Sequence, residues 1–131
     1  MKKSLGFTYL GLVALTVLFH IAIALGAPLG SFTQGGTVSG QLGAAGRVTA
    51  AVSALILVLF ALVVVRKAEI LPAKGHPKFV NFVFWIVLVF SALETLLNWI
   101  TPSDLERLVW GPVNTVLLVC VIGIAKLSRR K

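Results

Sequence analysis

Charge is scarce in this chain, and negative charge is scarcer still. Only 12% of its 131 residues are charged, and four acidic residues stand against twelve lysines and arginines. A soluble domain of ordinary composition has about 25% charged residues. Together with a hydrophobic share of 58% and a mean hydropathy of +1.00, this deficit excludes a soluble globular domain and indicates an integral membrane protein.

Cysteine and histidine are also nearly absent. The one cysteine, Cys120, lies inside an apolar run, so it is expected to be a small buried hydrophobic residue and no internal disulfide forms. The two histidines, His20 and His76, fall in segments expected at opposite membrane faces. No metal site and no cofactor are therefore predicted, and no nucleophile stands with an adjacent base.

Four long apolar runs occupy nearly the whole chain. They predict membrane-spanning helices at about residues 5–26, 47–66, 78–100 and 103–127, within a single domain that covers residues 1–131. The run after Met1 exceeds the roughly 7–15 residues of a signal-peptide core, so it is expected to remain as the first span. The predicted fold class is all-α, a bundle of four transmembrane helices.

The basic residues predict the orientation of this bundle. Ten of the twelve lie before the first run, between the second and third, or after the fourth, and only Arg47 and Arg107 fall elsewhere. By the positive-inside rule both termini are expected in the cytoplasm, with the bacterial inner membrane as the expected location. The basic clusters are expected to attract anionic lipid headgroups. Nucleic acid is not an expected partner, because no basic patch is interleaved with exposed aromatic residues.

The connections between the spans differ in composition. Residues 27–46 contain six glycines and no charge, which predicts an irregular outer loop. Two interpretations stay open for it: an ordinary connection, or a segment that packs on the mouth of the bundle. Residues 67–77 are predicted to form a basic cytoplasmic loop. Near the last span, Thr101 and Pro102 predict a helix start, with Thr101 as the N-cap.

The third run carries the polar residues on which a functional site is predicted. Glu94 is its only acidic residue, and at 100° per residue it shares a stripe with Ser91 and Asn98. A carboxylate inside such a segment costs roughly 3 kcal/mol on insertion scales, so it is expected to have a partner. Two partners stay open: His20, with which it would share a proton, and Arg47, with which it would form an ion pair.

Counting residues along the helices brings further polar groups to one level. His20, Glu94 and Asn114 each lie about 9–11 Å below the outer ends of their helices. We therefore predict a polar, outward-facing pocket that binds a ligand or is linked to protons. Its predicted residues are His20, Arg47, Ser91, Glu94, Asn98, Trp110 and Asn114.

Three functions stay open for such a protein. The favoured one is to bind or help move a small solute or protons through this pocket. The second is a non-catalytic accessory or structural subunit that packs on a larger membrane partner, and a homo-oligomer is open as well. The third, a membrane-embedded enzyme, is the least favoured, because one histidine and one glutamate are its only acid–base candidates.

Overall fold

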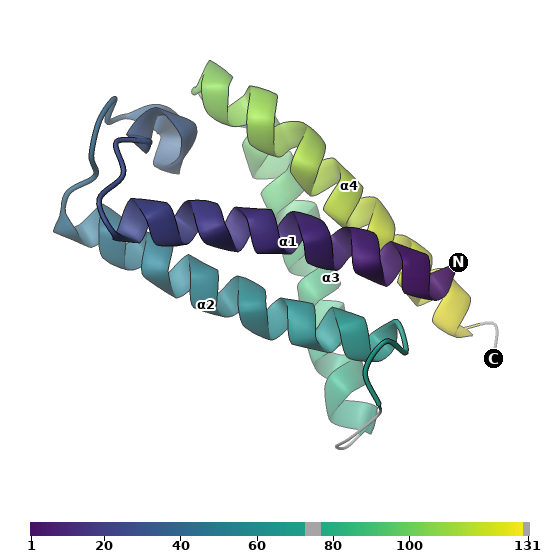
Figure 1. Cartoon of the computed structure of the whole chain (residues 1–131). Helices are drawn as coiled ribbons and strands as arrows, with labels where there is room; N and C mark the ends of the chain where they lie inside the picture. The colour runs from purple at the N-terminus through teal and green to yellow at the C-terminus, as the bar shows by residue number, and fades with distance from the viewer. Residues whose placement is uncertain (73–76, 130–131) are drawn as a thin grey trace.

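The computed structural model describes residues 1–72 and 77–129, in which the regular secondary structure is all helical (Figure 1). The described helices are α1 (Lys2–Ala24), η1 (Gly30–Phe32), η2 (Gln34–Gly36), α2 (Ala44–Lys67), α3 (Pro77–Ile100) and α4 (Asp104–Arg129), of which η1 and η2 are short 3₁₀ turns. Four of them are long and apolar enough to cross a membrane, as predicted. The basic loop predicted at 67–77, with His76, lies partly outside the described residues.

The first helix ends two residues earlier than predicted, because glycine closes it. Gly26 adopts a φ of +101°, and its amide bonds to the carbonyl of Ile23 at 2.9 Å. The next amide, of Ala27, reaches back to the carbonyl of Ala22, also at 2.9 Å. This pair of bonds is the Schellman motif, which satisfies the last carbonyls of a helix. The αL conformation at Gly26 would strain any other residue.

The predicted N-cap of the last helix is wrong. The hydroxyl of Ser103, not of Thr101, accepts the backbone amide of Glu106 at 3.2 Å, so α4 begins one residue later than predicted. The hydroxyl of Thr101 instead accepts the backbone amide of Ser103 at 3.4 Å and donates to the Glu106 carboxylate at 3.1 Å. At the other irregular boundary, α2 begins three residues before position 47, with Gly43 as its N-cap.

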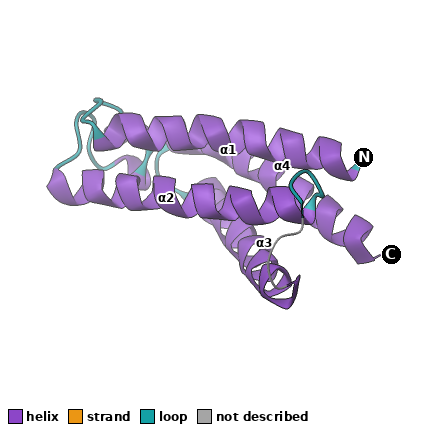
Figure 2. Ribbon diagram, turned by 60° about the horizontal axis from the view of Figure 1, so that its bottom comes forward, coloured by secondary structure: helices purple, strands orange, loops and turns teal. Residues whose placement is uncertain are grey.

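The helices are arranged as two antiparallel pairs. α1 lies alongside α2, α3 turns back into α4, and α4 also packs along α1 (Figure 1). α3 crosses the α1–α2 pair instead of running beside it (Figure 2). The start of α1 and the end of α4 lie at one end of the bundle, here called the basic end. The Gly-rich segment 25–43 and the α3–α4 turn lie at the opposite end, here called the loop end.

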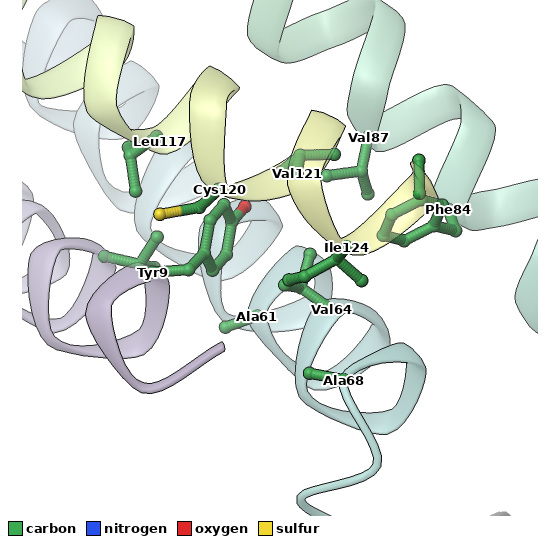
Figure 3. Close-up of a cluster of buried hydrophobic side chains, with 12 residues drawn as sticks. Tyr9, Ala61, Val64, Ala68, Phe84, Val87, Leu117, Cys120, Val121 and Ile124 are labelled. Carbon is green, nitrogen blue, oxygen red and sulfur yellow. The ribbon is translucent and has the colours of Figure 1, made fainter. Parts of the chain in front are cut away.

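A buried apolar core fills the half of the bundle nearer the basic end (Figure 3). Each long helix contributes to it, through residues such as Tyr9, Val64, Phe84 and Ile124 that are at most 2% exposed. Cys120 is buried there as well, as expected. Lipid is as apolar as these side chains, so close packing is what holds the helices together. This core positions the four helices around the space at the loop end.

Candidate functional site

A cavity of about 540 Å³ lies in the half of the bundle nearer the loop end. All four long helices line it, and so do residues of the Gly-rich segment. Tyr9 and Leu117 form part of both the cavity lining and the buried core, so the core closes the cavity toward the basic end. The volume falls within the roughly 300–1,000 Å³ of small-molecule pockets.

Most of the residues predicted for the site come together at this cavity. Its lining includes His20, Ser91, Glu94, Asn98, Trp110 and Asn114. The exception is Arg47, which is not part of the lining. Its Nε instead donates to the carbonyl of Ala24 at 2.9 Å. There it satisfies a free carbonyl at the end of α1, a position where a cation is also favoured by the helix dipole.

Glu94 is bonded to neither of the partners considered for it. Among the described residues its carboxylate meets only the side-chain amide of Asn98, at 3.4 Å, one turn along the same helix. That amide also donates to the backbone carbonyl of Glu94 at 2.8 Å. An ionised carboxylate has about four acceptor positions. Most acceptor positions of the Glu94 carboxylate therefore have no donor among the described residues, although the side chain is half-buried.

His20 is oriented by its own helix. Its Nδ1 lies 2.8 Å from the carbonyl oxygen of Thr16. A carbonyl can only accept, so Nδ1 carries a proton and Nε2 is the nitrogen left for other partners. Phe19 packs edge-on against the imidazole, with ring centroids 5.6 Å apart, and contacts the Trp110 ring at 4.7 Å. These contacts fix the ring at the wall of the cavity.

Several polar atoms of the lining have no hydrogen-bond partner within the described protein. They include Nε2 of His20, the side-chain amide of Asn114 and the hydroxyls of Ser53 and Ser91. None of them is sealed in, because the described residues contain no fully buried side-chain N or O atom without a partner. In a membrane interior, each unsatisfied polar group costs several kcal/mol. These atoms are therefore free to bond to water or to a ligand in the cavity.

The Gly-rich segment packs on the mouth of the cavity, the second of the two interpretations considered for it. The carboxylate of Glu106 accepts the backbone amide of Gly35 at 2.9 Å and the hydroxyl of Thr101 at 3.1 Å. The indole of Trp110 donates to the carbonyl of Phe32 at 2.8 Å. These bonds attach the segment to the first turns of α4 and bring Gly35 into the cavity lining.

Glu106 is the residue that sequence reasoning missed. Its spacing after Ser103 matches a capping box, which would have marked it as a residue of the helix start. That signal cannot reveal its contact with Gly35, which lies 71 positions away in the sequence. The Gly-rich segment and the start of α4 approach closely at Gly36, where a Cβ would lie 2.6 Å from Cβ of Ser103.

The cavity is lined by acidic residues although the chain is basic. Its charged lining residues, Glu94 and Glu106, are both acidic, and no lysine or arginine of the described chain lines it. The walls of a low-dielectric cavity focus such a field on whatever enters. The arrangement therefore favours a cation or a group rich in hydrogen-bond donors.

The cavity also has an apolar side between α2 and α3. The rings of Phe60 and Phe90 pack with their centroids 5.1 Å apart, and both line the cavity. Beyond that contact α2 and α3 separate toward the loop end (Figure 1), and residues of both helices line the cavity. There Leu97 and Ile100 of α3 are 54% and 65% exposed while also lining the cavity. The polar lining of the cavity is thus continuous with an apolar surface that the bilayer would cover.

Comparison with protein-family models, with curated proteins and with solved structures found no match to this chain. In the described ranges, no group of three His, Cys, Asp or Glu side chains comes together that could hold a metal ion. The function is therefore argued from the geometry of the cavity.

Proposed function

We propose that this chain is an integral membrane protein that binds a small cationic or donor-rich molecule in the cavity at its loop end, which the charge pattern assigns to the outer side of the membrane. The observation that carries this proposal is the set of unpartnered polar atoms around one cavity, with Glu94 among them. A ligand cation beside that carboxylate would provide the charge that no described residue provides.

The walls of the cavity narrow the chemistry of the ligand. Phe60, Phe90 and Leu97 offer apolar surface on one side, whereas His20, Glu94 and the asparagines offer polar groups on the other. A molecule with a charged head and an apolar body matches both. The core below Tyr9 and Leu117 is closely packed, so the geometry supports binding from one side better than passage across the membrane.

The accessory-subunit alternative receives no support from the small residues of α2. Three small residues of α2, Ala50, Ala54 and Ala61, are between 2% and 7% exposed within this chain. They pack against its own helices, so they are not available to a partner. A polar network that only joins the helices remains the competing interpretation, and the following experiment separates it from ligand binding.

Charged thiol reagents can measure both how accessible the cavity is from water and the sign of its charge. We would place a cysteine at the cavity wall by Asn114→Cys, in a Cys120→Ser background that removes the native thiol. A positively charged methanethiosulfonate should label it about 10- to 100-fold faster than a negatively charged one, because Glu94 lies in the same low-dielectric cavity. Adding Glu94→Gln should abolish most of this preference.

A lipid-facing cysteine provides the matched control. Leu96 is 57% exposed on α3 and does not line the cavity, so Leu96→Cys should react with neither reagent in a bilayer. If the cysteine at position 114 is equally unreactive, the cavity is closed and the polar residues only join the helices. Equal rates for both reagents would contradict the proposed preference for cations.

A further inference from the structure

A second, smaller cavity lies at the basic end and shares no lining residue with the first. Its volume is about 250 Å³, and it is formed by the last turns of α2 and α4 together with the first half of α3. Its lining residues are Lys67, Asn81, Phe84, Trp85, Ala125, Ser128 and Arg129.

The two basic side chains of this cavity are positioned without being neutralised. Nζ of Lys67 donates to the side-chain oxygen of Asn81 and lies 5.7 Å from the centroid of the Phe84 ring. The guanidinium of Arg129 lies 4.9 Å from the centroid of the Trp85 ring. Cation–π contacts of this kind orient a cation but supply no net negative charge.

Neither cation forms a salt bridge with a carboxylate among the described residues. The acid nearest to Lys67 in the sequence, Glu69, pairs with Lys2 at 2.9 Å and also attracts Lys67 electrostatically. The side-chain NH₂ of Asn81 is also available as a donor, because its oxygen is the atom that Lys67 engages. The cavity therefore presents N–H donors from α2, α3 and α4, and two basic side chains that form no salt bridge with a described carboxylate.

We propose that this cavity binds the phosphate of an anionic phospholipid. A guanidinium fork and an ammonium group next to an amide are the donors that proteins use for phosphate oxygens. The cavity lies at one end of four spanning helices, the level at which headgroups lie. Phe82 and Ile86 on α3 are 64% and 44% exposed beside it and would face the acyl chains. This adjoining apolar surface favours a lipid over free phosphate.

The test measures binding to the full-length protein in an uncharged detergent. Phosphatidylglycerol is added in steps, and its affinity is read from the rise in the unfolding temperature, with phosphatidylcholine as the uncharged lipid. Phosphatidylglycerol should stabilise the protein and phosphatidylcholine should not. The double variant Lys67→Gln/Arg129→Gln should weaken phosphatidylglycerol binding about tenfold or more, since it removes two charge-assisted contacts.

A second pair of substitutions controls for the overall charge. Lys78→Gln/Lys126→Gln removes the same charge from the same end, and neither residue lines the cavity. It should change the affinity by less than about threefold, the effect of exposed charges that are screened by salt. An equal loss in both double variants would overturn the proposal, because binding would then be general attraction to a basic surface. Absence of any difference between the two lipids would overturn it as well.

Two further measurements remove the remaining ambiguities. Arg129→Lys keeps the charge and loses the fork, so it should still weaken phosphatidylglycerol binding several-fold, even where the glutamine pair fails to fold. Unchanged affinity in this variant would contradict the proposed contact. The second measurement adds inorganic phosphate in place of the lipid. If phosphate raises the unfolding temperature as much as phosphatidylglycerol does at similar concentrations, free phosphate is the ligand and the lipid proposal is refuted.

Discussion

Glu106 attaches the Gly-rich segment to the bundle, so its removal tests whether this segment covers the cavity. In Glu106→Ala the amide of Gly35 and the hydroxyl of Thr101 both lose their acceptor, at present 2.9 and 3.1 Å away. Hydrogen bonds to a charged group are worth about 1.5–3 kcal/mol each. The loop end can be rehydrated after the change, so we expect a loss of about 2–4 kcal/mol, less than the full sum.

The assay compares this variant with a second acid of the same helical turn. The Asp104 side chain is 95% exposed and, among the described residues, bonds only to Arg107, at 2.6 Å, so Asp104→Ala should cost no more than about 1 kcal/mol. Both variants remove one negative charge from the start of α4, where the helix dipole favours it. The difference between their unfolding free energies, measured by denaturant titration in detergent, therefore isolates the attachment of the segment.

Proteolysis locates the effect. Protease should cut the Gly-rich segment faster in Glu106→Ala than in Asp104→Ala, because the amide of Gly35 is no longer held. Glu106→Gln keeps one side-chain oxygen as acceptor and should lie between the two. Equal stability and equal cleavage in the alanine variants would refute the argument, since Glu106 would then act only as a charge at the helix start.

Two further predictions concern packing and orientation. Gly111→Ala should destabilise the protein by about 1–3 kcal/mol in thermal unfolding, because the added Cβ would lie 3.1 Å from the Trp99 ring. Gly11→Ala is the control: its added Cβ would meet nothing within 4 Å, so this change should be neutral or stabilising by up to about 1 kcal/mol. Similar effects at the two glycines would contradict the α3–α4 packing. Reporter fusions should place both termini in the cytoplasm, and a terminus on the outer side would reject the orientation on which the outward direction of the cavity depends.

The helices and the shared level of the polar residues could be predicted because both follow from fixed helical geometry. A rise of about 1.5 Å and a turn of 100° per residue place Ser91, Glu94 and Asn98 on one face, whatever the neighbouring helices are. Counting along each helix then brings His20 and Asn114 to the same depth. The structure places all five around one cavity.

The partners of the charged residues could not be predicted, because they depend on which elements meet in space. Arg47 is long enough to reach either a carboxylate or a helix end, and it bonds to the carbonyl of Ala24. Glu106 meets a backbone amide of an irregular segment, for which no periodic pattern exists. The crossing of α3 over the α1–α2 pair is likewise set by side-chain packing and leaves no signature in hydropathy.

That crossing accounts for the position of the cavity. At the basic end small residues let the helices approach closely, as at Gly6, where a Cβ would lie 2.6 Å from Cβ of Ala68. Phe60 and Phe90 meet where α2 and α3 pack, and beyond them the two helices separate toward the loop end (Figure 1) and both line the cavity. A polar side chain in a spanning helix must face protein or water, so the residues at this level have only that space to face. The packing that stabilises one half of the bundle therefore creates the cavity in the other half.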